Sequence, residues 1–65
     1  MPDFKPGDVV TVKYPERWPF TIREHGYLYV VYAVTSLGLE VSVRSVATGT
    51  IGLFKREEII GADDD

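Results

Sequence analysis

The chain has 65 residues, 45% of them hydrophobic, and no cysteine, so it forms one domain at most and gains no stability from disulfides or thiolate-bound metal. The formal net charge is −3, but the last three residues are all aspartate, and the remaining acidic side chains equal the 7 Lys and Arg in number. A body without net charge lacks the positive field that drives nonspecific nucleic-acid binding.

The two ends of the chain and its longest apolar run predict where the domain ends and in which compartment the protein lies. Residues 1–60 are expected to form the domain, and residues 61–65 an acidic, flexible tail. The apolar run at residues 27–34 is far shorter than the roughly 20 residues of a membrane helix. The start lacks the charged and apolar regions of a signal peptide. We therefore expect no membrane partner and a cytoplasmic location, in the cell of origin or in an infected host.

Residues 9–14 predict the first strand. Val10, Val12 and Tyr14 share one face, and alternation with β-branched residues is typical of a strand. Pro15 ends the strand because proline donates no hydrogen bond to a ladder. Residues 15–26 are predicted to form a loop stiffened by two prolines, with residues 21–23 extending briefly as a strand arm.

Residues 27–34 predict the strongest strand, and both of its faces are apolar. Tyr27, Tyr29, Val31 and Ala33 alternate with Leu28, Val30, Tyr32 and Val34. A half-exposed antiparallel strand normally alternates with polar residues. Either this strand is covered on both faces within the domain, with Tyr29 and Val31 in the core, or one face meets another chain.

Three shorter strands complete the predicted set. Residues 39–45 alternate, with Leu39, Val41 and Val43 inward, and residues 47–50 form a tight hairpin connection in which Gly49 adopts positive φ. The returning strand, residues 50–54, is expected to direct Ile51 and Leu53 inward, with Gly52 at a bend or a close backbone approach. Residues 55–58 are expected to supply about one helical turn, the only helix, before a short strand at residues 59–60.

This order of elements resembles that of SH3-like small β-barrels. The opening Lys5-Pro-Gly-Asp-Val-Val-Thr-Val12 is similar to the start of KOW-type domains. The stretches His25–Val34 and Gly52–Ile59 look like parts of small phage and bacterial SH3-like proteins. The resemblance implies an all-β fold, a small five-stranded barrel with one short 3₁₀ turn before the last strand. Phe4 and Phe54 would then close the barrel ends.

The sequence favours no catalytic, cofactor or metal site. The only histidine, His25, lies beside Gly26 at the predicted loop end and is expected to be an exposed loop residue. Ser36, Ser42 and Ser45 lie in a turn or on strands without a nucleophile motif around them. We therefore expect a protein that is not an enzyme.

Aromatic and basic residues gather in the predicted loop and in the strand that follows it. Trp, Tyr and Arg dominate protein-binding hot spots, and a stiff loop loses little entropy on docking. The candidate partner-binding residues are Arg17, Trp18, Phe20, Arg23, Tyr27 and Tyr32. Trp18 is the ring most expected outside the core, and a core position stays open. Trp18→Ala should keep the fold and lose the partner in the first case, and unfold the protein in the second.

The prediction is a non-catalytic protein-interaction module, an accessory or inhibitor protein that docks on a larger partner. A homo-oligomer through residues 27–34 is a related possibility. The alternative is a small barrel that binds single-stranded nucleic acid by stacking bases on Trp18 and Phe20 beside Arg17 and Arg23.

Overall fold

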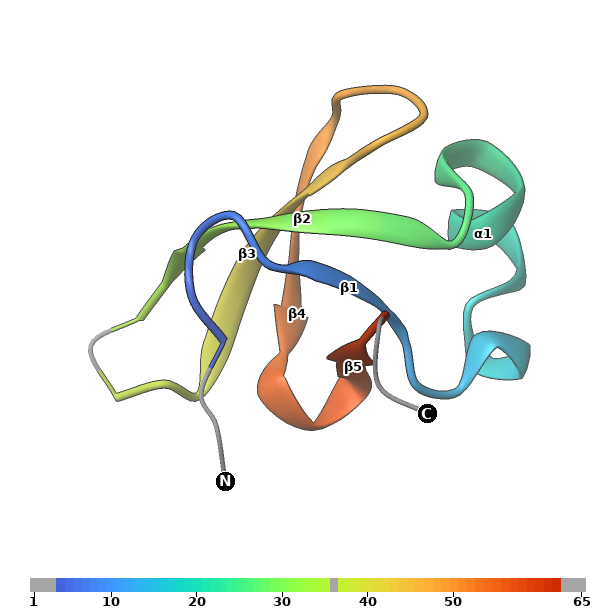
Figure 1. Ribbon diagram of the computed structural model, residues 1–65. Coiled ribbons are helices and arrows are strands. Elements are labelled where there is room, and N and C mark those ends of the chain that lie inside the picture. Colours follow the sequence, from blue (N-terminus) through green and yellow to red (C-terminus); the bar gives the residue numbers. More distant parts are fainter. Residues whose placement is uncertain (1–3, 36, 63–65) are drawn as a thin grey trace.

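Five antiparallel strands form one sheet in the computed structural model, which describes residues 4–35 and 37–62. The strands are β1 (Val9–Val12), β2 (Leu28–Val34), β3 (Glu40–Ser45), β4 (Ile51–Lys55) and β5 (Ile59–Gly61). Their order across the sheet is β4-β3-β2-β1-β5 (Figure 1). The predicted set of five strands is confirmed. Within the described chain β4 and β5 are the two outer strands and do not pair, so the sheet is not closed.

Short helices connect the strands: η1 (Pro15–Arg17), α1 (Pro19–His25) and η2 (Arg56–Glu58). The helical turn expected before the last strand is confirmed as η2. The loop and strand arm predicted for residues 15–26 are wrong, because this segment is mostly helical, and so is the expectation of a single helical turn. Pro15 and Pro19 each open a helix. Proline suits that position because its φ is already helical and its missing N–H would have no intrahelical partner.

The core lies on one face of the sheet. Alternate residues of β1, β2 and β3 point into it, and Phe54 of β4 and Ile59 of β5 complete it; the buried apolar side chains are Val10, Val12, Tyr29, Val31, Val41, Val43, Phe54 and Ile59. Phe4, Trp18 and Val34 are partly buried against this cluster. The core positions predicted for Tyr29 and Val31 are therefore confirmed.

Three apolar residues that were predicted to face inward are on the outside. Leu39 is 65% exposed, Ile51 54% and Leu53 58%. Register with β3 explains the β4 residues, since Phe54 pairs with the buried Val41 and must share its inward face. Side chains alternate along a strand, so Leu53 then points outward.

A bulge in β2 changes which of its residues face the core. The pairing with β3 shifts between Val31 and Ala33, and an extra residue there reverses the alternation. Val34 is partly buried against the core, and Tyr32 is 59% exposed. The two faces predicted for residues 27–34 are therefore correct up to Val31 and wrong beyond it.

Strand β2 lies inside the sheet, between β1 and β3. Residues 28–30 pair with β1, and residues 29–34 pair with β3, so a second copy of the chain cannot add to an edge of β2 along residues 29–30, where both sides are paired. A homo-oligomer through this first half of the strand would use its outward face, where Leu28 is 47% exposed.

The sheet continues slightly beyond residue 60, where the domain was predicted to end. Gly61 is the last residue of β5, and the Ala62 N–H donates a hydrogen bond of 3.0 Å to the Val9 carbonyl. Residues 63–65 of the predicted acidic tail, and Ser36, lie outside the described residues. No helix in the described chain is long and apolar enough to cross a membrane.

Candidate functional site

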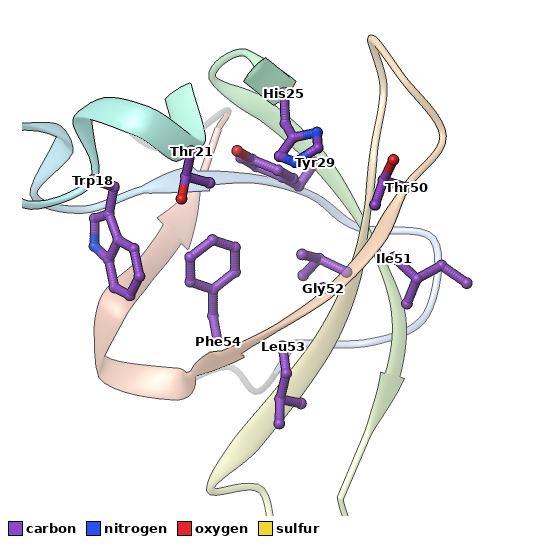
Figure 2. Close-up of a pocket in the computed structure, with 10 residues that line it drawn as sticks. Trp18, Thr21, His25, Tyr29, Thr50, Ile51, Gly52, Leu53 and Phe54 are labelled. Carbon is purple, nitrogen blue, oxygen red and sulfur yellow. The ribbon is translucent and has the colours of Figure 1, made fainter. Parts of the chain in front are cut away.

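A half-open groove lies between helix α1 and strand β4 (Figure 2). Its volume is about 220 Å³. Helix α1 and its N-cap residue, strands β2, β3 and β4, and the residue before β4 contribute the lining residues: Trp18, Thr21, His25, Tyr29, Val43, Thr50, Ile51, Gly52, Leu53 and Phe54. One wall is therefore the helix, the other is an edge strand of the sheet, and the core forms the floor.

Aromatic rings form one end of the groove. The Trp18 and Phe54 rings meet edge-on, with centroids 5.2 Å apart and an interplanar angle of 82°. Tyr29 and Phe54 make a similar contact at 5.5 Å and 71°. Such edge-to-face pairs are favourable beyond the apolar area they bury. Trp18 is thus partly buried in the aromatic cluster on the core, so of the two positions left open for it, outside the core or within it, the structure favours the core.

Helix spacing explains which residues of α1 reach the groove. Trp18, Thr21 and His25 follow one another at intervals of three and four residues, so they share one side of the helix. Phe20 belongs to the opposite side and is 74% exposed. A helix of two turns is too short to be stable alone in water, so its contacts with the sheet hold it in place.

Hydrogen bonds tie the C-terminal end of α1 to the β3–β4 hairpin. The Ser45 hydroxyl donates to the His25 carbonyl at 2.7 Å and accepts from the Thr48 N–H at 3.2 Å. The His25 Nδ1 lies 3.0 Å from the Thr48 Oγ1. The Tyr29 hydroxyl, from β2, donates to the Gly26 carbonyl at 2.9 Å. These bonds fix the distance between the two walls at one end of the groove.

Gly52 keeps the middle of the groove open. It pairs with Val43, whose side chain is buried, so a side chain at position 52 would point inward from the sheet. A Cβ placed there meets no heavy atom of any described residue within 4 Å, its own residue and two chain neighbours aside. The backbone of Gly52 does not need positive φ either, unlike Gly49 at 77°. Neither close packing in this chain nor backbone geometry calls for glycine at this position.

The chemistry of the groove is that of binding to an apolar group with a few polar contacts. Its floor is aromatic and aliphatic, and hydroxyls of Thr21 and Thr50 and the imidazole of His25 line its rim. Burial raises the pKa of the Tyr29 phenol above 10.0 because desolvation disfavours the phenolate. The described residues contain no group of three or more His, Asp or Glu side chains that could hold a metal ion.

The predicted partner-binding residues do not form one patch. Trp18 lies in the groove wall, while Arg17 at the end of η1 and Phe20 and Arg23 on α1 are exposed nearby along the chain. Tyr27, just before β2, is 59% exposed. Tyr32 is at the bulge five residues further along β2, roughly 16 Å away at the usual rise of a strand.

Several groove residues were not selected from the sequence. Thr21 and His25 were assigned to a loop, so their helical spacing with Trp18 was not considered. Gly52 is predicted from the sequence only as a bend or a close backbone approach, not as part of a binding site. Comparison of the chain with protein-family models, with curated proteins and with solved structures found no match.

Proposed function

We propose that this chain is an SH3-like, non-catalytic module that binds a partner protein in the groove between α1 and β4. The proposal extends the resemblance of the sequence to small phage and bacterial accessory proteins, and it assigns the module to the cytoplasm. The strand order β4-β3-β2-β1-β5, the tight β3–β4 connection and the turn η2 before β5 support an SH3-like arrangement.

The observation that carries the proposal is the groove itself. A small domain needs its apolar side chains for stability, yet beside the buried Tyr29 and Phe54 this groove leaves Trp18 only partly buried and Ile51 and Leu53 more than half exposed. A volume of about 220 Å³ is below the roughly 300–1,000 Å³ of typical small-molecule sites. It suits one or two side chains of a partner protein. Exposed Arg17, Phe20, Arg23 and Tyr27 would extend the contact around the helix wall.

Nucleic acid fits the groove less well. Its lining contains neither Lys nor Arg, whereas proteins that bind single strands combine stacking rings with positive charge along the backbone. Trp18, one of the two rings expected to stack on bases, is engaged edge-on with Phe54. The other, Phe20, is exposed on the far side of the helix.

Two substitutions on α1 test the proposal. Thr21→Arg places a long charged side chain in the groove, and Glu24→Arg places the same side chain on an exposed position of the same helix. The tagged full chain and both variants would be used for affinity capture from lysate of the source cell, with and without nuclease, followed by mass spectrometry.

We expect one protein in stoichiometric amount with the wild type and with Glu24→Arg, resistant to nuclease, and absent with Thr21→Arg. Recovery that disappears with nuclease would replace the proposal with nucleic-acid binding. Equal recovery by all three chains would show that the groove is not the site.

A further inference from the structure

The edge strand β4 presents free backbone groups beside the groove. A hydrogen bond lies just beyond each end of its paired segment with β3. The Ser45 N–H donates to the Thr50 carbonyl at 2.9 Å, and the Arg56 N–H donates to the Leu39 carbonyl at 3.0 Å. Bonded and non-bonded positions alternate in an antiparallel pair. Thr50, Gly52, Phe54 and Arg56 therefore bond to β3.

The N–H and C=O groups of Ile51 and Leu53 consequently point away from β3, toward the open edge. No described residue supplies a hydrogen-bond partner for them. At the next such position the Lys55 N–H is already occupied, because it donates to Glu58 Oε1 at 2.9 Å. The open part of the edge is thus confined to the two residues that flank Gly52.

Natural sheets usually protect their edges with short strands, charge, proline or bulges. The other edge strand, β5, has only 3 residues. The open part of β4 has none of these protections: Ile51 and Leu53 are neutral and more than half exposed, and their pairing with β3 is regular. An unprotected edge of this kind can receive an added strand.

We propose that an extended segment of another protein adds to β4 as a further strand and inserts one large apolar side chain into the groove over Gly52. The proposal rests on the proposed function and names its binding mode. Backbone hydrogen bonds to Ile51 and Leu53 would hold the segment. Cross-strand neighbours share a face of a sheet, so the residue beside Gly52 would direct its side chain into the groove.

Gly52 connects the two parts of the proposal. Glycine inside a strand weakens it, and often marks a place where a ligand or another backbone approaches closely. Apart from Gly52 and its two chain neighbours, no heavy atom of the described residues lies within 4 Å of a Cβ at position 52. The space is bounded by Phe54 and Trp18 at one end and opens toward His25 and Thr50 at the other (Figure 2). A side chain from the added strand would fill it.

A second copy of β4 does not meet these requirements. Its inward-facing residues are Gly52 and Phe54. Gly52 has no side chain to insert. Phe54 is 5% exposed and already packs against Trp18 and Tyr29. The segment that fits is therefore one that carries its own unoccupied aromatic or long aliphatic residue, flanked by residues able to form a strand.

The test uses a displayed library of random 12-residue peptides, selected against the immobilised full chain. We expect the selected peptides to share one large apolar residue. A synthetic copy of the most enriched peptide would then be added to the chain, and amide hydrogen exchange would be followed by NMR. The Ile51 and Leu53 amides should become protected at least 10-fold, since no described residue of the free protein accepts a hydrogen bond from them.

A matched pair of variants isolates the backbone contact. Leu53→Pro removes an N–H that bonds to no residue in the described part of the chain, and Leu53→Thr removes the same apolar side chain but keeps the N–H. We expect Leu53→Pro to bind the peptide at least 5-fold more weakly than Leu53→Thr. If Leu53→Pro does not fold, the exchange measurement on the wild-type chain decides.

The inference is overturned if no peptide is enriched, or if the selected peptide binds without protecting Ile51 and Leu53. It is also overturned if these amides become protected with rising protein concentration alone, because the occupant would then be a second copy. Competition by a single-stranded oligonucleotide would assign the edge to nucleic acid. If Thr21→Arg abolishes capture of the partner while Leu53→Pro and Leu53→Thr bind it equally, the proposed function stands and strand addition fails.

Discussion

The indole of Trp18 stands at 82° to the ring of Phe54, with their centroids 5.2 Å apart. Trp18 comes from the junction of η1 and α1, and Phe54 from the edge strand β4. The contact joins the two walls of the groove and covers the core at the same time. The side chain that was most expected to serve a partner therefore also supports the fold.

Trp18→Ala should lower the free energy of unfolding by about 2 kcal/mol, measured by urea unfolding with far-UV circular dichroism. Fully buried Trp truncations cost about 3–5 kcal/mol, and Trp18 is only partly buried. Phe20→Ala, two residues along, on the opposite side of the helix and 74% exposed, should stay within about 0.5 kcal/mol of the wild type. Equal stability of the two variants would contradict the core role of Trp18.

Ser45→Ala should cost about 1–3 kcal/mol, because it leaves the His25 carbonyl and the Thr48 N–H without their hydrogen-bond partner. Ser45 is 3% exposed. Ser42→Ala on the same strand is the control, since the Ser42 side chain makes no hydrogen bond in the described chain; its effect should stay within about 0.5 kcal/mol. Denaturant midpoints that fall equally for both would show that the bonds to α1 contribute nothing.

Stability should fall as the pH rises above 10. Burial raises the pKa of the Tyr29 phenol above 10.0, so the folded chain binds this proton more tightly than the unfolded chain. The contribution of Tyr29 is complete below the unfolded pKa near 10 and is lost as the pH rises through the folded pKa. Urea unfolding between pH 8 and about pH 11 would measure it.

Tyr29→Phe separates the titration from the hydrogen bond. The variant loses the bond to the Gly26 carbonyl, which should cost about 0.5–1.5 kcal/mol at neutral pH. Its stability should then decline less steeply at alkaline pH than that of the wild type. Parallel declines would mean that Tyr29 does not supply the alkaline loss.

Two glycines of one hairpin should respond in opposite ways to alanine. Gly49 has φ of 77°, so Gly49→Ala should cost about 1–2 kcal/mol. Gly52 lies in a strand with open space at its Cβ position, so Gly52→Ala should leave stability unchanged or raise it by about 0.5 kcal/mol. A clear loss of stability in Gly52→Ala would show that glycine is required there by the fold. Thermal unfolding of both variants makes the comparison.

The sequence by itself determined most of the strands. Alternation of β-branched residues located β1, β2 and β3 because a pleated strand places successive side chains on opposite faces. Gly49 located the β3–β4 turn, since only glycine adopts positive φ without cost. The neutral body and the absence of cysteine followed from composition alone.

Only the tertiary structure determined that the groove between α1 and β4 exists and which residues line it. Residues 15–26 were predicted to form a loop because they contain two prolines and few apolar residues. They contain a two-turn helix instead, and a helix this short is stable only through its contacts with the sheet. The inward face of β4 could not be read from Ile51-Gly-Leu-Phe54, where apolar residues occupy both faces; pairing of Phe54 with Val41 selects it. The groove forms only when that register and the position of α1 are set together, because its two walls are distant in sequence.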